Sequence, residues 1–244
     1  MKHRLCVGEH VTAAGDTPGT ELNLPDDQAH YLARVLRLKA GGRLNVFDGC
    51  GREWLAEVDR IERRRVSLIL HNLVRDEPPP TPLVLVQSWL KGSAMDAVVQ
   101  KSVELGATAI RLLDADRSNV KTDERRRQNR LAHLERVIQS AAEQCETLWL
   151  PTLTVAESLA EILESPRPGR TLFLDPGGRS ISSGGPEPLT LLIGPEGGWS
   201  ERERDRAQAD EAVETVGLGP LTLRAETAPL AVLSAVRQLW NWSR

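Results

Sequence analysis

The sequence predicts an α/β protein in which a small β-barrel domain precedes a mainly parallel sheet. After a proline-rich segment at 78–82, apolar runs typical of buried strands alternate with segments of helical periodicity. This alternation favours a parallel sheet covered by helices on both faces. Before the prolines, short strand-like runs are separated by turn residues, which is typical of a small barrel. Forty percent of the 244 residues are hydrophobic, so both parts are able to bury a core.

The first part predicts one helix and three short strands. The helix is expected at about 26–38, where Leu32, Val35 and Leu36 share an apolar side. Strands are expected at 44–47, 54–58 and 66–70, with a hairpin loop at 48–51 between the first two. Four prolines within 78–82 exclude helix and sheet pairing and favour an extended spacer. We therefore predict a first domain at 1–76 and a second at 77–244.

The second part predicts alternating strands and helices. Strands are expected at 83–87, 109–113, 171–174, 189–193 and 213–216. Helices are expected at 93–105, at about 123–145, near 155–164, after Ser200, and at the C-terminal end of the chain. Ser200 and Glu203 have the spacing of a capping box, so Glu203 is interpreted as a residue that initiates a helix. Pro229 fits the first turn of the last helix, whose apolar stripe predicts a core or an oligomer contact.

Composition limits the possible functions. The three cysteines are far apart and lack nearby histidine pairs, so neither a disulfide framework nor a metal site is predicted. No apolar run approaches the length of a membrane span, and the N-terminus lacks the apolar region of a secretory signal. We therefore expect a cytoplasmic protein that contacts no membrane.

Charge disfavours a chain that coats nucleic acid as a whole, because the formal net charge is -3. One local basic patch stands out between Arg117 and Arg130, where basic residues exceed acidic ones. Its basic members are Arg117, Lys121, Arg125, Arg126, Arg127 and Arg130. Charge alone leaves two interpretations open: an RNA contact or a solvated helix face.

Two glycine- and proline-rich loops follow predicted strands near the C-terminus. The first is the Gly-Pro-Glu-Gly-Gly run at 194–198, and the second is the Gly-Leu-Gly-Pro run at 217–220. Ligands of open α/β sheets bind where strands end, so these loops predict a ligand site. Neither loop has a phosphate-binding or dinucleotide-binding spacing, and Glu196 would repel a phosphate. A neutral or cationic ligand is expected, read largely through main-chain groups.

These loops, with three other stretches, resemble the RsmE family of SPOUT-class methyltransferases, which methylate N3 of a uridine in small-subunit ribosomal RNA. The first loop carries the family pattern through Ser200 and Glu203, and the second through Arg224, Glu226 and Ala228. The other matching stretches are Lys91 to Gly106, Ala141 to Cys145, and, in the first part, His30 to Arg37 with Phe47 to Gly49. The resemblance spans nearly the whole chain.

The resemblance implies a trefoil-knotted SPOUT domain that binds S-adenosylmethionine and works as a homodimer, preceded by a PUA-like RNA-binding domain. General topology rules would have excluded a knot, so periodicity alone does not predict it. The implied cofactor-binding residues are Leu174, Asp175, Pro176, Ile193, Gly194, Pro195, Glu196, Gly198, Leu218, Gly219 and Leu223. A sulfonium cofactor agrees with the separate prediction that the ligand is not a phosphate.

The chain departs from the family pattern at two places. Ala225 stands where the family often has threonine, and Glu146-Thr147 replace a Gly-Arg type step. The second change adds a negative charge near an end of the long helix that is expected to face RNA.

Methylation at uridine N3 requires loss of the imide proton before attack on the methyl group. Glu226 is therefore predicted to be the base, or the group that orients it, and Arg224 to hold the uracil anion or a phosphate. The alternative is an internal ion pair between Arg224 and Glu226 that shapes the knot. Glu196 is interpreted as a structural carboxylate that accepts hydrogen bonds from main-chain amides of a helix or loop.

RNA contacts are expected from both parts of the chain. The predicted residues are Arg34, Arg37, Arg43, Arg117, Lys121, Arg125, Arg126 and Arg127. Such phosphate contacts position a nucleic acid without specifying its sequence.

Three functional hypotheses follow. The first is a methyltransferase acting on uridine N3 of 16S ribosomal RNA, and the five ordered motifs favour it. The second is a SPOUT enzyme with another target, such as a tRNA ribose, which the stretch Lys91 to Gly106 disfavours. The third is a non-catalytic RNA-binding or assembly factor, which S-adenosylmethionine binding would distinguish from the others.

Overall fold

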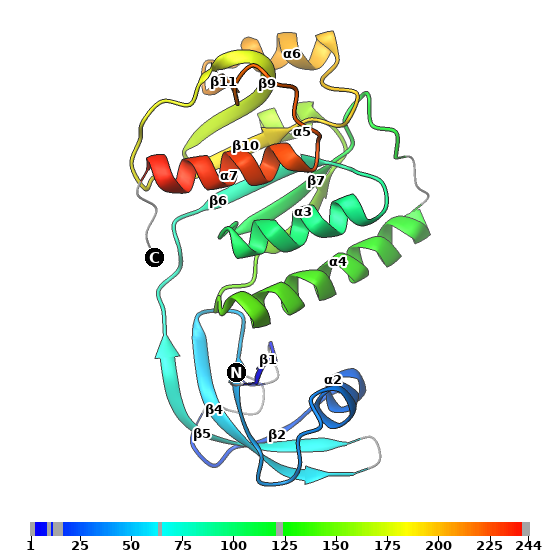
Figure 1. Cartoon of the computed structure of the whole chain (residues 1–244), viewed down its shortest axis with the longest axis vertical. Coiled ribbons are helices and arrows are strands. Elements are labelled where there is room, and N and C mark those ends of the chain that lie inside the picture. The colour runs from blue at the N-terminus through cyan, green and yellow to red at the C-terminus, as the bar shows by residue number, and fades with distance from the viewer. Residues whose placement is uncertain (1–2, 9–10, 12–16, 63–64, 121–123, 241–244) are drawn as a thin grey trace. The chain divides into compact units, whose positions relative to one another are not determined.

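The computed structural model describes residues 3–8, 11, 17–62, 65–120 and 124–240 of the chain. They form two compact units (Figure 1). The first unit comprises Met1–Pro79 and Ala142–Leu150, and the second comprises Pro80–Ala141 and Pro151–Arg244.

The first unit is built on a five-stranded sheet with the order β1-β3-β4-β5-β2. Its strands are β1 (Arg4–Cys6), β2 (Glu21–Asn23), β3 (Arg43–Phe47), β4 (Arg52–Ile61) and β5 (Val66–Asp76). Strands β1 and β3 are parallel, and the other neighbours are antiparallel. The sequence predicts β3, β4 and β5 but not β1 and β2, because three-residue strands are too short to show an alternating pattern.

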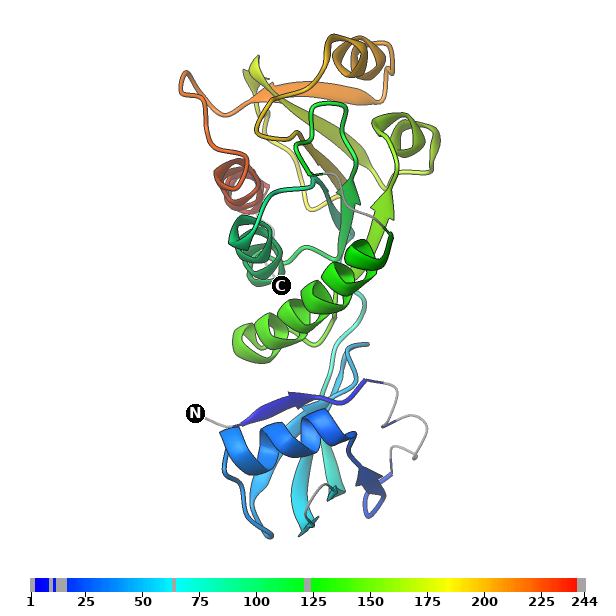
Figure 2. The same ribbon diagram turned by 90° about the vertical axis from the view of Figure 1, so that its right-hand side faces the viewer.

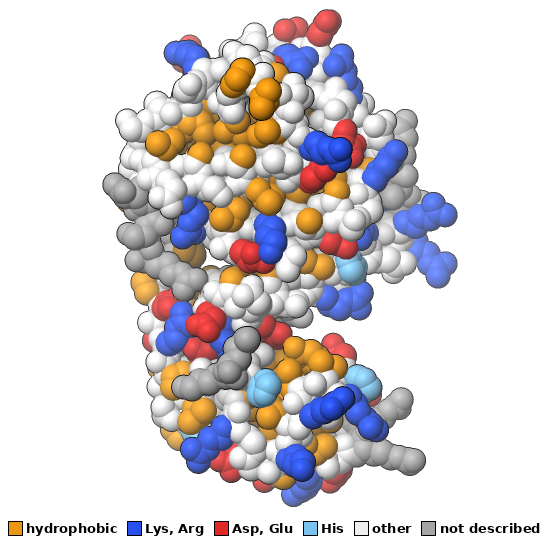
Figure 3. All heavy atoms as spheres, viewed as in Figure 1, with side chains coloured by type: hydrophobic (Ala, Val, Ile, Leu, Met, Phe, Trp, Pro, Cys, Tyr) orange, Lys and Arg blue, Asp and Glu red, His pale blue; other side chains and the backbone are white. Residues whose placement is uncertain are grey.

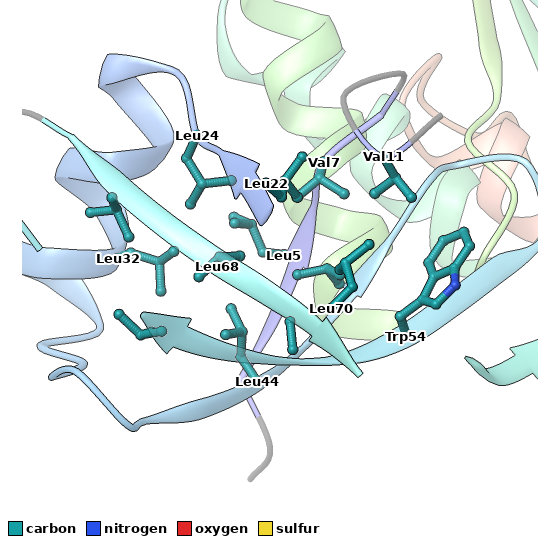
Figure 4. Packing of buried hydrophobic residues seen from close by; sticks show 14 of the residues in the cluster. Leu5, Val7, Val11, Leu22, Leu24, Leu32, Leu44, Trp54, Leu68 and Leu70 are labelled. Atoms are coloured by element: carbon teal, nitrogen blue, oxygen red, sulfur yellow. The ribbon is translucent and has the colours of Figure 1, made fainter. Parts of the chain in front are cut away.

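One helical segment closes the core of this unit. Helix α2 (Asp26–His30) continues directly into the π-helical turn η1 (Tyr31–Val35), so the helix predicted to reach residue 38 is shorter and changes its hydrogen-bond pattern. Figure 4 shows Leu32 of η1 pointing toward leucines of the sheet. Leu32 and Leu68 are fully buried in this cluster.

Residues 142–150 pack with the first unit, although the sequence places them far beyond residue 76. The Arg4 guanidinium donates to the carbonyl oxygen of Ala142 at 3.0 Å, and Glu143 accepts a bond from the Cys6 amide at 3.0 Å. The Trp149 indole donates to the carbonyl oxygen of Glu77 at 3.2 Å. No local pattern predicts this packing, because each bond joins residues more than 70 positions apart.

The second unit contains a six-stranded sheet with the order β11-β9-β10-β6-β7-β8. Every neighbouring pair is parallel, which confirms the predicted sheet type. The strands are β6 (Leu83–Ser88), β7 (Ala109–Leu113), β8 (Thr152–Ala156), β9 (Arg170–Ser180), β10 (Leu189–Ile193) and β11 (Val213–Gly217). All five residues of β10 are buried, as expected for a central strand with covered faces.

Among the described residues, the second part of the sequence forms the helices α3 (Ser93–Glu104), α4 (Glu124–Cys145), α5 (Leu159–Glu164), α6 (Glu201–Gln208) and α7 (Thr227–Leu239). In Figure 2, α3 and α7 lie side by side on one face of the sheet, and α5 lies on the opposite face. The helix predicted near 155–164 is wrong in its first part, where β8 ends. Helix α5 begins only after Ser158, whose hydroxyl accepts a bond from the Glu161 amide at 3.2 Å.

The last helix is a core element. Val232, Leu233 and Val236 are fully buried, and so is Trp240, which follows the helix. The Trp240 indole donates to the carbonyl oxygen of Ser182 at 3.0 Å. Among the described residues, no helix has both the length and the apolar character to cross a membrane.

Candidate active site

Strands β10 and β11 of the second unit end beside one cavity of about 700 Å³, and residues 174–176 within the neighbouring strand β9 also line it. Because parallel strands present their carboxyl ends at the same edge, the loops that follow them meet there. Figure 3 shows hydrophobic side chains gathered over the part of this unit where Figure 1 draws these strands.

The structure brings the predicted site residues of the second unit to this cavity. All of the predicted cofactor-binding residues line it, as do Arg224 and Glu226. The cavity is also lined by Gly197, Gly217, Leu221 and Thr222 of the two predicted loop segments, and by Trp199, Val216, Ala225 and Ala228, which were not predicted to bind the cofactor. Their positions within or beside the two glycine loops are the only sequence signal for them.

Strand β9 leaves its pairing with β11 beside the cavity and then resumes it. Thr215 of β11 pairs with Phe173, but the next residue, Val216, pairs with Arg179. Residues 174–178 therefore leave the pairing with β11, and the first three of them line the cavity. A small ligand-facing loop is thus inserted into an otherwise continuous strand.

Trp199 holds this loop in place through its indole group. Its indole Nε1 donates to the carbonyl oxygen of Leu174 at 2.8 Å, and its ring stacks on Phe173 with centroids 4.6 Å apart. A Cβ atom at Gly194 would lie 3.0 Å from the indole. Gly194 is therefore needed for the close approach of the first glycine loop to Trp199.

The first glycine loop is a tight turn. The Gly198 amide donates to the carbonyl oxygen of Pro195 at 2.9 Å, and Gly198 has a φ of +66°, which favours glycine. Ser200 then caps α6. Its hydroxyl accepts a bond from the Glu203 amide at 3.1 Å, and the Glu203 carboxylate accepts one from the Ser200 amide at 2.8 Å. The capping box predicted from the sequence is confirmed.

The same carboxylate anchors the loop after β7. Glu203 accepts a second bond, from the Asp116 amide at 3.1 Å. The Ser200 hydroxyl and the Arg202 guanidinium bind the Asp116 carboxylate and lower its pKa. The neighbouring Arg117 touches the glycine loop, because a Cβ atom at Gly197 would lie 3.3 Å from the Arg117 Cβ. An exposed basic residue therefore lies next to the cavity.

The charged groups of the cavity contradict two interpretations of the sequence: that Glu196 accepts main-chain amide hydrogen bonds, and that Arg224 and Glu226 form an internal ion pair. Glu196 is exposed, and within the described ranges it accepts no hydrogen bond from a helix or loop amide. Arg224 and Glu226 approach only to 3.7 Å, and the Arg224 side chain is 85% exposed while that of Glu226 is 33% exposed. Since Arg224 is exposed, the two residues do not form a buried ion pair inside the fold, and both groups are accessible to a ligand.

The predicted basic patch separates into different roles. Arg125 and Arg126 are exposed on α4. Arg127 is only 17% exposed and binds Asp114 at 2.8 Å and Glu157 at 2.6 Å, so it stabilises the fold rather than offering a free charge. Lys121 lies outside the described residues.

The predicted basic residues of the first unit lie at its surface. Arg34 and Arg37 are exposed at and just after η1. Arg43 is also exposed and forms an ion pair with Glu57 at 3.2 Å. An exposed pair of this kind contributes little stability, so Arg43 is able to exchange its partner at low cost.

Known proteins match both units. A family described as an RNA methyltransferase domain matches residues 77–237, and one described as an RNA methyltransferase PUA domain matches residues 24–70. The ribosomal RNA small subunit methyltransferase E of Synechocystis is 33% identical over 249 aligned residues, covering 98% of this chain and 78% of that protein.

Two solved structures share the fold over nearly their whole length. One is ribosomal RNA small subunit methyltransferase E from Neisseria gonorrhoeae bound to S-adenosyl methionine, with 30% identity and a TM-score of 0.86 over 98% of both chains. The other is a Legionella pneumophila methyltransferase in complex with the same cofactor, with 27% identity and a TM-score of 0.90 over 98% of both chains.

The fold and the loops at its sheet edge are therefore those of a trefoil-knotted SPOUT methyltransferase with a PUA-like domain. Within this class, the chain belongs to the ribosomal RNA small subunit methyltransferase E family, RsmE.

Proposed function

We propose that the protein transfers the methyl group of S-adenosylmethionine to N3 of a specific uridine in 16S ribosomal RNA. The observation that carries the proposal is the cavity in which Arg224 and Glu226 stand beside the two glycine loops. Membership in the RsmE family supports the same reaction, since the relatives are named as methyltransferases of small-subunit ribosomal RNA.

The charges of the cavity favour a cationic cofactor. Its lining includes the carboxylates of Glu196 and Glu226 and the guanidinium of Arg224, whereas the charge of a further lining carboxylate, Asp175, is compensated by Arg204. Opposite charges attract a sulfonium, whereas this set would disfavour a polyphosphate. S-adenosylmethionine, when bound here, supplies a methyl group that a nitrogen anion is able to attack. The glycine loops would hold it through main-chain groups.

The remaining chemistry belongs to the protein. Glu226 is half-buried beside the cavity, where it would accept the N3 proton of the uracil. Arg224, 3.7 Å from it, would stabilise the negative charge that then spreads over the flanking carbonyl oxygens. A bond forms between N3 and the methyl carbon while the carbon–sulfur bond breaks, so S-adenosylhomocysteine leaves with the electron pair.

Exposed arginines of both units would hold the RNA. Arg117 lies beside the glycine loop, Arg125 and Arg126 are exposed on α4, and Arg34 and Arg37 are exposed on the first unit. We propose that residues 1–76 serve mainly RNA binding and residues 77–244 methyl transfer. The proposal includes a homodimer acting in the cytoplasm on the small ribosomal subunit.

The decisive experiment uses 16S ribosomal RNA from a strain that lacks the gene, offered both as naked RNA and as assembled small subunits. Incubation with the purified protein and S-adenosylmethionine should produce one 3-methyluridine, detected by nucleoside mass spectrometry. A ribose-methylated nucleoside would instead indicate a different SPOUT target. Failure of the protein to bind S-adenosylmethionine in calorimetry would indicate a non-catalytic RNA-binding factor.

A further inference from the structure

The loop at 174–178 forms one wall of the cavity and is held by side chains from the segment around α6. Trp199 binds the main chain of Leu174 at 2.8 Å. Arg204, on α6, binds the side chain of Asp175 with two hydrogen bonds, 2.9 Å from Nε and 3.0 Å from Nη2. A bidentate pair of this geometry fixes both the position and the orientation of a carboxylate.

Arg204 also approaches the first glycine loop. A Cβ atom at Gly198 would lie 3.7 Å from Nη2 of Arg204, so the guanidinium packs beside the first glycine loop. Arg204 does not line the cavity itself, whereas Asp175 and Gly198 do. The guanidinium therefore binds the β9 loop and lies beside the glycine loop without lining the cavity, so any effect that it has on a ligand must pass through Asp175 or these loops.

Asp175 keeps hydrogen-bonding capacity after this pairing. A carboxylate has about four lone-pair positions, and Arg204 occupies one on each oxygen. The Asp175 side chain is 15% exposed and faces the cavity, so a ligand donor is able to reach a remaining position. Since Arg204 compensates its charge, Asp175 is an oriented acceptor rather than a free anion.

We propose that Arg204 is a positioning residue for the cofactor: it orients Asp175 to accept a hydrogen bond from a hydroxyl or ammonium donor of S-adenosylmethionine. This inference rests on the proposed function. Arg204 would thus affect cofactor affinity although it lies outside the cavity. It would take no part in proton transfer or RNA binding.

The test compares Arg204→Gln, Arg204→Lys and Asp175→Asn with the wild-type protein. Calorimetry with S-adenosylmethionine should show Arg204→Gln binding about tenfold more weakly, the scale of one lost charge-assisted contact. Arg204→Lys, which offers a single ammonium, should lose less. The double variant Arg204→Gln/Asp175→Asn should lose no more cofactor affinity than the weaker-binding single variant, because both changes break the same Asp175–Arg204 pair.

Steady-state kinetics separate positioning from a merely structural role. Arg204→Gln should raise KM for S-adenosylmethionine while kcat and KM for RNA change less than twofold. Arg206→Gln is the matched control, because Arg206 lies on the same helix but pairs with Glu164, away from the cavity. It should leave cofactor affinity unchanged.

Binding of 5′-methylthioadenosine identifies the donor. This analogue keeps the ribose hydroxyls but lacks the ammonium group, so an equal loss of its affinity in Arg204→Gln indicates a hydroxyl and no loss indicates the ammonium. The inference is overturned if Arg204→Lys and Arg204→Gln both keep wild-type affinity for S-adenosylmethionine, or if Arg206→Gln loses as much. If the wild-type protein binds no S-adenosylmethionine, the proposed function itself fails.

Discussion

The indole Nε1 of Trp199 lies 2.8 Å from the carbonyl oxygen of Leu174, so a residue just before α6 fixes the point at which β9 leaves its pairing with β11. The same ring stacks on Phe173 and contacts the glycine loop at Gly194. One side chain therefore couples two walls of the cavity, and its chemistry leads to the first prediction.

Replacing Trp199 by Phe keeps an aromatic ring but removes the hydrogen bond to Leu174. A partly buried carbonyl that loses its donor costs about 1–3 kcal/mol, so the free energy of unfolding should fall by that amount in urea denaturation. KM for S-adenosylmethionine should rise several-fold because the loop loses its support. Trp240→Phe is the control: it loses a similar bond, to Ser182 at 3.0 Å, away from the cavity. Equal effects of both variants on KM would contradict the assignment.

Replacing Glu226 by Gln should remove the proposed proton acceptor without changing the shape of the cavity. General base catalysis contributes roughly 10²–10⁴-fold, so kcat for 3-methyluridine formation should fall within that range. The dissociation constant for S-adenosylmethionine, measured by calorimetry, should rise much less than kcat falls, because Glu196 keeps its charge beside the cavity. Glu211→Gln, at an exposed position outside the cavity, should behave as the wild type. A Glu226→Gln variant with normal kcat would assign proton removal to another group.

Arg125 and Arg127 should respond differently to loss of charge. Arg127→Gln breaks the hydrogen-bonded ion pairs with Asp114 and Glu157 and should lower the free energy of unfolding by about 1–3 kcal/mol. Arg125→Gln, on the exposed surface of α4, should leave stability unchanged and weaken RNA binding. The slope of log affinity against log salt concentration should fall by about one for Arg125→Gln. An unchanged slope would exclude Arg125 from the RNA contact.

The free energy of unfolding should depend on pH through the carboxyl group of Glu143. Burial raises the pKa of its carboxyl, and the hydrogen bond from the Cys6 amide and the charge of Arg4 only partly oppose this shift. A raised folded-state pKa contributes stability that is complete below the unfolded value of 4.5 and is lost as pH rises through the folded value.

The variant Glu143→Gln removes this loss, because the amide oxygen still accepts from Cys6 but carries no charge. Urea unfolding should find it more stable than the wild type at about pH 7, with the difference vanishing near pH 4. A variant that is less stable at neutral pH would show that the charge of Glu143 stabilises the first unit.

Local chemistry in the sequence is sufficient to predict the class of the fold and the two glycine loops. The rule that parallel strands are apolar on both faces predicts β6, β7 and β10 closely, and the strand expected at 213–216 coincides with β11. The capping box at Ser200 depends only on residues three apart, so its prediction from the sequence is confirmed. Periodicity does not predict the knot, because a knot is a property of the path of the chain and not of any local segment.

Contacts between distant residues were decided by the tertiary structure. The order of the strands brings the ends of β10 and β11 and the middle of β9 to one cavity, and only then do Asp175 and Arg204 form a pair. Ion pairs with Asp114 and Glu157 make Arg127 a structural residue, although its sequence context resembles that of Arg125. The physical reason is the same in each case: charge and periodicity are encoded locally, whereas partners and burial depend on which segments the fold places side by side.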